Sequence, residues 1–319
     1  MASTPLPRVA VVGAGAVGAY FGGMLARAGA NVTLIGRPVH VDVWRRDGLY
    51  VDSINFQERI AVEASTDVAR SGDADLVLFS VKSLDTEETA RQLARHVRGD
   101  AAVVSLQNGV DNVARMRAAA ALDPIASVVY VASSMPAPGR ITHGGRGDLL
   151  IGDLPGRPGP PREDTLARVS AWFEAAGVPC RVSPNIAADL WTKLITNASL
   201  NAISAVVHAP YGDVVAIPES REAVRQLVNE CVAVARADGV SLPDVDFVDL
   251  VLRFAEKVGP VYASTAQDLD RGKPTEIDAL NGFVVRRGDQ LGVPTPVNQS
   301  LVALVKLRER QFERAAAKA

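Results

Sequence analysis

The chain has few residues that could cross-link it or hold a metal. Its 319 residues include only two cysteines, Cys180 and Cys231. Two cysteines cannot build a disulfide scaffold or a zinc cluster, and their apolar neighbours predict that both are buried small side chains. The four histidines are His40, His96, His143 and His208. Their spacing does not match that of metal ligands, so we expect surface or loop positions for them and no metal site.

Long hydrophobic runs and an excess of one charge are also missing. No stretch approaches the roughly 20 apolar residues that span a bilayer, and residues 1–7 lack the charged-then-apolar pattern of a signal peptide. With 34 Lys and Arg against 36 Asp and Glu, the net charge is -2, which attracts neither nucleic acid nor an anionic membrane. No GxSxG sequence indicates a hydrolase. We therefore expect a cytoplasmic protein that acts on small molecules, with no nucleic-acid or membrane partner.

The first half of the chain alternates strand and helix patterns. Short apolar runs predict strands at residues 8–12, 31–35, 75–80 and 102–106. Helices are predicted at 17–28 and 87–97. This alternation favours right-handed βαβ units and a parallel sheet.

The end of this half is rich in proline and glycine. Residues 136–147 are expected to begin a more antiparallel edge that includes 149–151. Residues 154–161 predict a surface loop, and a helix follows through Trp172 and Phe173.

Beyond Pro184 the sequence shows helical patterns only. They cover 186–207, 219–238, 246–258, 275–291 and 296–317. We predict an α/β, Rossmann-like, doubly wound N-terminal domain (1–184), which binds the cofactor, and an all-α C-terminal domain (185–319), which binds substrate and carries the catalytic residues. A cleft between two such domains is the usual place for ligands.

A glycine-rich motif opens the first predicted helix. It reads Gly13, Ala14, Gly15, Ala16, Val17, Gly18. Following a strand and opening a helix, this spacing is typical of dinucleotide binding. Gly13 allows the tight turn, Gly15 lets the backbone approach a pyrophosphate, and Gly18 lets the helix pack on the sheet.

The end of the second strand indicates which dinucleotide is bound. NAD enzymes usually carry a carboxylate there, whereas this chain has Gly36-Arg37. An arginine can pair with a 2′-phosphate that a carboxylate would repel, so NADPH/NADP+ is the predicted cofactor. The alternative is that Arg37 is a solvated surface residue.

Several separated motifs, taken in order, resemble the ketopantoate reductase (2-dehydropantoate 2-reductase) family over nearly the whole chain. They are the glycine motif, Ser80-Val81-Lys82, Gln107-Asn108-Gly109, Leu190-Trp191-Thr192-Lys193-Leu194 with Asn197 and Asn201, residues 264–268 (STAQD), residues 275–278 (TEID), and residues 280–283 (LNGF). This resemblance implies reduction of ketopantoate to pantoate with NADPH.

Lys193, Asn197 and Asn201 recur every four residues on a predicted helix, so they form one polar stripe. Their neighbours are apolar, which indicates that the helix is largely buried: Leu190, Leu194, Leu200 and Ile203. Buried polar groups need partners, which a structural hydrogen-bond network would also supply. The resemblance implies that Lys193 is the proton donor and that Asn197 and Asn201 hold the hydroxyl and carboxylate region of the substrate. Burial can lower a lysine pKa, which suits a general acid near neutral pH.

Four further residues receive roles from the resemblance. Glu276, expected in the first helical turn after Pro274, would face Lys193 and the nicotinamide ribose. Ser264 would bind the substrate carboxylate. Asn108 would lie near the nicotinamide and the substrate, and Lys82 near the cofactor. From their chemistry alone, Glu276 and Ser264 could be helix-capping residues and Lys82 a solvated loop charge.

One position departs from the family pattern. In the enterobacterial form an asparagine precedes a glycine after the lysine helix, whereas here that position falls on Tyr211. An opine-type or hydroxyacid dehydrogenase, another 2-keto acid reductase, and a non-catalytic NADP-binding sensor are the alternatives. The last helix could cap its domain or form a homodimer contact.

Overall fold

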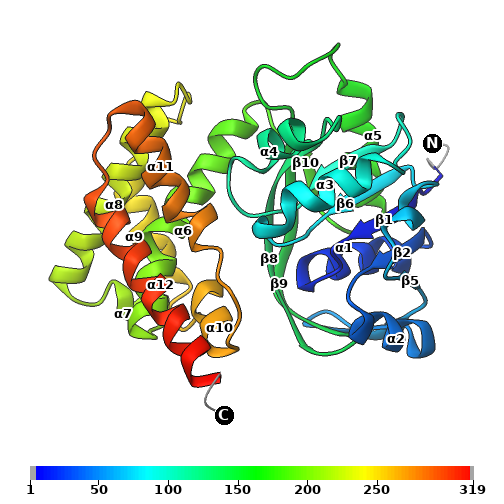
Figure 1. Cartoon of the computed structure of the whole chain (residues 1–319), viewed down its shortest axis with the longest axis horizontal. Helices are drawn as coiled ribbons and strands as arrows, with labels where there is room; N and C mark the ends of the chain where they lie inside the picture. The colour runs from blue at the N-terminus through cyan, green and yellow to red at the C-terminus, as the bar shows by residue number, and fades with distance from the viewer. Residues whose placement is uncertain (1–4, 317–319) are drawn as a thin grey trace. The chain divides into compact units, whose positions relative to one another are not determined.

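The computed structural model describes residues 5–316 and divides into two compact units between Ile186 and Ala187. The first unit combines a sheet with helices, and the second is helical (Figure 1). This confirms the predicted fold class, an α/β Rossmann-like part followed by an all-α part.

One sheet forms the centre of the first unit. Its strands are β1 (Arg8–Val12), β2 (Asn31–Ile35), β3 (Leu49–Ser53), β4 (Gln57–Ile60), β5 (Glu63–Ser65), β6 (Leu76–Phe79), β7 (Ala102–Ser105), β8 (Ile125–Ala137), β9 (Arg140–Gly152) and β10 (Cys180–Val182). Their order is β4-β3-β9-β8-β7-β6-β1-β2-β5, and β10 pairs with β9. Six neighbouring strands pair in parallel, in the order β8-β7-β6-β1-β2-β5. This confirms the predicted βαβ arrangement.

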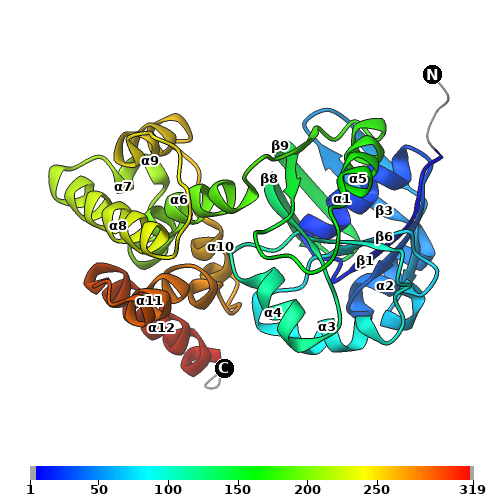
Figure 2. The ribbon, with the colours of Figure 1, turned by 90° about the horizontal axis from the view of Figure 1, so that it is seen from above.

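Helices cover both faces of this sheet (Figure 2). They are α1 (Ala16–Arg27), α2 (Pro38–Asp47), η1 (Val68–Ser71), η2 (Ser83–Asp85), α3 (Thr86–Ala94), α4 (Asn112–Ala119) and α5 (Glu163–Ala175). Because side chains alternate along a strand, β1 contributes to two cores. Val11 belongs to the core that contains Phe21 of α1 and Phe173 of α5, whereas Val12 belongs to the core that contains Leu93 of α3.

The prediction that the segment from 136 onward forms an antiparallel edge of the sheet is wrong in one respect. β9 does pair antiparallel with β8, but it lies inside the sheet because β3 pairs with its other side. β4 and β5 form the ends of the strand order instead. β3 and β4 were not predicted, although side chains along β3 alternate between buried and partly exposed as in a half-buried strand. β3 pairs with β9 on one side and with β4 on the other.

Two histidines expected on the surface or in loops are buried within regular structure. His143 lies on β9 with 2% of its surface exposed, where its ring stacks on Tyr20 at 4.4 Å between centroids. Its nitrogens lie 2.9 Å from the Ser53 hydroxyl and 2.6 Å from the Arg146 carbonyl. His40 is buried on α2 against Trp44. The His143 imidazole can be buried because both of its nitrogens have hydrogen-bond partners, which spacing in the sequence could not reveal.

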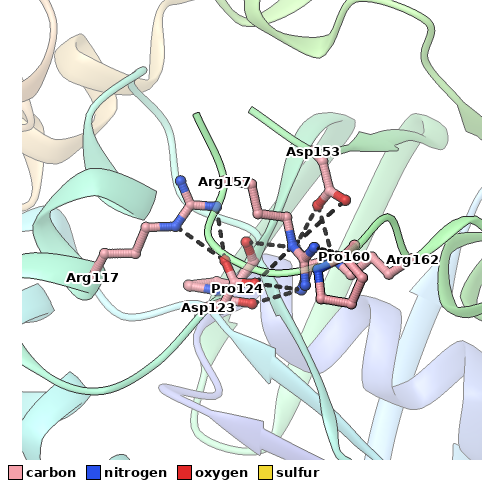
Figure 3. A network of polar contacts seen from close by, with 7 residues as sticks. All are labelled: Arg117, Asp123, Pro124, Asp153, Arg157, Pro160 and Arg162. Carbon is pink, nitrogen blue, oxygen red and sulfur yellow. Dashed lines mark hydrogen bonds and ion pairs between the residues drawn. The ribbon is translucent and has the colours of Figure 1, made fainter. Parts of the chain in front are cut away.

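The predicted surface loop at 154–161 is held by a network of arginines and aspartates (Figure 3). Arg157 reaches Asp123 at 2.7 Å, and Arg162 reaches Asp153 at 2.5 Å. Arg117 pairs with the same Asp123 at 2.8 Å. The loop is thereby fixed to the segment that enters β8.

The second unit consists of helices. They are α6 (Ile186–Val207), which begins at the division itself, α7 (Tyr211–Val214), α8 (Pro218–Ala237), α9 (Phe247–Lys257), α10 (Ser264–Asp270), η3 (Ile277–Ala279), α11 (Asn281–Leu291) and α12 (Pro296–Ala316). The helix predicted for 275–291 is wrong at its start, because the chain breaks at Leu280 (φ -105°, ψ -101°). Residue 317, the expected end of the last helix, lies outside the described residues.

Two expectations from composition concern burial and membranes. Cys180 and Cys231 are both free and buried, as predicted, and burial raises the pKa of each thiol to about 12. Among the described residues, no helix has the length and apolar character that crossing a membrane requires.

Candidate active site

The glycine motif forms a turn that is tied to the neighbouring strand. After β1, Gly13 takes φ +82°, a conformation that favours glycine. The amides of Gly13 and Ala14 both donate to the carbonyl of Ile35, at 3.0 and 2.9 Å. The turn is therefore held at the end of β2, directly before α1 begins.

The three glycines of the motif have different surroundings. A Cβ on Gly18 would lie 2.1 Å from the Ser80 hydroxyl and 2.8 Å from Val11, and one on Gly13 would lie 2.4 Å from Val81. A Cβ on exposed Gly15 would meet only the Gly13 carbonyl, at 3.9 Å. Nothing among the described residues requires glycine at 15, so the open space above it fits the close approach of a pyrophosphate.

The start of α1 also suits an anion. Its N-cap, Gly15, supplies no side-chain hydrogen bond, and the first turn contains no acidic residue. Amides in the first turn of a helix lack partners within the helix and carry partial positive charge. The residues present therefore fit a dinucleotide phosphate.

Arg37 lies at the N-cap of α2, two residues beyond β2, and is exposed. One guanidinium nitrogen lies 3.5 Å from Nε2 of His40. Among the described residues, no carboxylate forms an ion pair with Arg37. Its charge is thus uncompensated by the protein at the strand end where a 2′-phosphate would lie.

The loops after β6 and β7 are bound to each other and to the glycine turn. The Ser80 hydroxyl donates to the Gly13 carbonyl at 2.9 Å. Buried Gln107 donates from Nε2 to the Val81 carbonyl at 3.1 Å and to the Thr86 hydroxyl at 2.7 Å. These bonds fix the carboxyl ends of three adjacent parallel strands, where open α/β sheets bind ligands.

Lys82 and Asn108 extend from these fixed loops. Lys82 is exposed and precedes η2. Asn108 is half-buried, and its carbonyl accepts a hydrogen bond from the Asn112 amide at 2.6 Å. Sequence reasoning quoted Gln107 as part of a motif but gave it no role. The two acceptors of its Nε2 lie more than 20 residues away, and only the fold reveals them.

In the second unit, α6 carries the predicted polar stripe. Lys193 and Asn197 are half-buried, and Asn201 is 3% exposed. Leu194, with 2% exposure, lies on a neighbouring face of the helix. The helix covers 186–207 as predicted, so these three side chains share one face.

Asn201 has a partner that the sequence did not predict. The hydroxyl of Tyr211 donates to Oδ1 of Asn201 at 2.8 Å. Both side chains are buried, and burial raises the pKa of Tyr211 to about 12. The residue that departs from the family pattern thus contacts a predicted substrate residue.

Ser264 begins α10 and is exposed. Its neighbour Ala263 donates from its amide to the Ser204 hydroxyl on α6, at 3.3 Å. Ser204 lies three residues after Asn201 on α6, so it is on nearly the same face of the helix as the polar stripe. This contact ties the start of α10 to the end of α6.

Glu276 does not lie in the first turn of an α-helix, as was expected. It is the N-cap of the short helix η3 and is half-buried. The segment is anchored by Thr275, whose amide and hydroxyl both donate to Glu309 of α12 at 2.7 Å. Fully buried Asn281 donates to the Ala198 carbonyl of α6 at 2.8 Å and to Asn298 of α12 at 2.9 Å.

The predicted site residues therefore form two sets. Within the first unit, the glycine turn, Arg37, Lys82 and Asn108 follow the carboxyl ends of parallel strands. Within the second unit, Lys193, Asn197 and Asn201 share α6, and hydrogen bonds connect the segments that carry Ser264 and Glu276 to that helix or to α12.

Two family models match separate parts of the chain. The model described as ketopantoate reductase PanE/ApbA matches residues 9–156, and the model of its C-terminal part matches residues 185–309. The 2-dehydropantoate 2-reductase of Halobacterium salinarum is 33% identical over 306 residues, which cover 95% of this chain and 99% of that relative.

Solved structures give the same result. A PanE/ApbA family ketopantoate reductase from Ralstonia eutropha matches with a TM-score of 0.88 and 46% identity, over 96% of this chain and 99% of that one. A D-mandelate dehydrogenase solved with NADH and anilino(oxo)acetate shares the fold, with a TM-score of 0.87, 23% identity, and coverage of 96% and 99%. With both halves matched in order and relatives aligned along nearly their full length, the chain belongs to the ketopantoate reductase PanE/ApbA family.

Proposed function

We propose that this protein is an NADPH-dependent 2-dehydropantoate 2-reductase, which reduces ketopantoate to pantoate. Relatives that align with almost the whole chain carry this name. The observation that carries the proposal is the polar stripe of Lys193, Asn197 and Asn201 on a helix whose buried residues are mostly apolar.

In this proposal the first unit holds the cofactor. The turn from Gly13 to Gly18 binds the pyrophosphate through the first-turn amides of α1, because the amides of Gly13 and Ala14 already donate to Ile35. Arg37 pairs with the 2′-phosphate, and Lys82 and Asn108 contact the nicotinamide half. Glu276, which belongs to the second unit, also contacts the nicotinamide ribose in this proposal. When bound, NADPH supplies a hydride to the ketone carbon. The open space at Gly15 and the lack of a carboxylate paired with Arg37 support this assignment.

The second unit supplies the proton and the substrate contacts. Hydride arrival builds negative charge on the ketone oxygen, which needs a proton or a fixed positive group. Lys193 donates that proton from Nζ and regains one from water. Glu276 keeps the lysine charged and oriented. Asn197, Asn201, Ser264 and Asn108 bind the hydroxyl and carboxylate of the substrate.

The test measures the oxidation of NADPH with ketopantoate as substrate and, in a parallel assay, with 2-ketoisovalerate. A site built to bind the substrate hydroxyl leaves polar groups unpaired when that hydroxyl is missing. We therefore expect a higher kcat/KM for ketopantoate than for 2-ketoisovalerate. Binding of NADPH without turnover of any 2-keto acid would contradict the proposal and favour an NADP-binding sensor.

A second candidate is a reductase of a bulkier 2-keto acid. Tyr211, which stands where the enterobacterial form has an asparagine, contacts Asn201 and so changes a predicted substrate contact. The related fold of a D-mandelate dehydrogenase supports considering an aromatic substrate. Faster turnover of a bulky 2-keto acid than of ketopantoate would establish this candidate instead.

Assembly and location complete the proposal. Val305 of α12 packs with Ala202 of α6 and Ile277, so this helix caps its own unit. Leu304 and Leu307 on α12 are 44% and 57% exposed, and they would supply a homodimer contact. Sedimentation analysis tests the homodimer, and cell fractionation tests a cytoplasmic location.

A further inference from the structure

Tyr211 and Asn201 form a buried pair in the second unit. Tyr211 is the first residue of α7, and its hydroxyl donates to Oδ1 of Asn201 at 2.8 Å. The two residues are 8% and 3% exposed. Hydrogen bonds between side chains are a small minority in proteins, so a buried one at a predicted substrate residue calls for a reason.

The phenol ring is held in place from two other directions. The Tyr211 amide donates to the Val261 carbonyl at 2.9 Å, three residues before Ser264. The ring lies 5.9 Å from that of Phe254 on α9. Burial raises the pKa of Tyr211 to about 12, so its hydroxyl stays protonated at neutral pH and can donate to Oδ1.

In the structure the Tyr211 hydroxyl occupies the oxygen end of the Asn201 amide. An asparagine amide can rotate by half a turn and exchange its oxygen and nitrogen with little change of shape. Here Oδ1 is occupied by the Tyr211 hydroxyl, so Nδ2 is the end left for other partners. Among the described residues Nδ2 makes no hydrogen bond. Nδ2 is not among the fully buried side-chain atoms that lack a partner, so an acceptor oxygen on a ligand can reach it.

We propose that Tyr211 is a positioning residue that fixes Asn201 as a hydrogen-bond donor to an acceptor oxygen of the 2-keto acid, in its carboxylate or in a hydroxyl, opposite Nδ2. This inference rests on the proposed function, because it takes Asn201 as a substrate contact. Replacement of an asparagine by Tyr211 then changes how the substrate is selected, while the hydride and proton steps stay with the cofactor and Lys193.

The first experiment compares Tyr211→Phe with Tyr50→Phe. Tyr50 lies on β3 in the other unit, and its hydroxyl makes no hydrogen bond with the described residues. Tyr211→Phe keeps the ring but frees Oδ1, so the amide can rotate. Since a neutral hydrogen bond contributes modestly, we expect KM to rise about threefold to tenfold, with kcat changed less than about twofold. Tyr50→Phe should change neither.

A purely structural role predicts a different result. Tyr211→Phe would then lower the melting temperature and the fraction of active enzyme but leave KM unchanged, and that result would overturn the proposal. A second measurement removes Asn201. If Tyr211 acts through Asn201, the KM of Asn201→Ala should be the same with or without Tyr211→Phe, whereas independent, multiplying effects would overturn the proposal.

The proposed function and the role of Tyr211 can be tested separately. Turnover of ketopantoate by the unaltered protein tests the proposed function before any variant is made. The coupling of Tyr211 to Asn201 is then measured with the 2-keto acid that the unaltered protein reduces best, ketopantoate or phenylglyoxylate. Loss of coupling with an active substrate contradicts the role of Tyr211 alone.

Discussion

Replacing the glycines of the cofactor turn one at a time should separate folding from NADPH binding. At Gly15 the backbone has φ -84°, which any residue adopts, and a new Cβ would meet only the Gly13 carbonyl at 3.9 Å. Gly15→Ala should therefore leave the free energy of unfolding unchanged or raise it by up to ~1 kcal/mol.

Gly18→Ala should behave in the opposite way. Its Cβ would lie 2.1 Å from the Ser80 hydroxyl and 2.8 Å from Val11 Cγ1. The hydroxyl can rotate, but it would lose its bond to the Gly13 carbonyl, and Val11 lies in a closely packed core. Overpacking of this kind costs about 1–3 kcal/mol.

Gly15→Ala, which should not destabilise the fold, should nevertheless weaken NADPH binding. In the Gly15→Ala variant the added methyl occupies the space that a pyrophosphate would need, and a lost charge-assisted hydrogen bond costs ~1.5–3 kcal/mol. We expect about tenfold to a hundredfold weaker NADPH binding. Chemical denaturation and fluorescence titration measure the two quantities. If Gly15→Ala binds NADPH as tightly as the unaltered protein, the pyrophosphate does not lie over this glycine.

Three further predictions concern cofactor choice, helix positioning and the proposed partner of Lys193. Arg37→Ala should weaken NADPH by about tenfold to a hundredfold and leave NADH little changed, with Arg46→Ala, from the same helix, as control; equal loss for both cofactors contradicts the 2′-phosphate contact. Asn281→Ala removes two fully buried hydrogen bonds and should lower the free energy of unfolding by about 2–4 kcal/mol, whereas exposed Asn55→Ala should not; equal stability of the two variants in urea would show that Asn281 does not hold α6. Glu276→Ala should lower kcat less than loss of Lys193 does and should also raise KM, because it leaves the lysine charge uncompensated; an unchanged KM would exclude this orienting role.

Local patterns predicted those elements that short-range rules determine. The glycine turn follows from a strand, two closely spaced glycines and a helix start. The helix at 186–207 follows from its unbroken apolar periodicity. In both cases the residues that decide the structure lie within a few positions of one another.

Elements that depend on distant partners were missed. β3 is extended because it pairs with β9, about 90 residues later in the chain. The helix break at Leu280 accompanies the bonds of Asn281 to Ala198 and Asn298. Tyr211 stood out in the sequence as a departure from the family, but its bond to Asn201 depends on how α7 folds back along α6. No sequence pattern encodes such contacts.

The central claim is that Lys193 donates the proton during reduction of a 2-keto acid. General-acid catalysis contributes ~10²–10⁴ in rate, so Lys193→Ala should lower kcat within that range. NADPH affinity should persist, because it depends mainly on the glycine turn and Arg37. Lys257→Ala, an exposed lysine at the end of α9, is the matched control and should retain full activity.

The decisive measurement is the kcat of Lys193→Ala with ketopantoate at saturating NADPH, with cofactor binding confirmed by fluorescence titration. The account predicts a fall of at least about a hundredfold with NADPH affinity unchanged. A kcat close to that of the unaltered protein would show that the proton comes from another group and would contradict the assignment of Lys193.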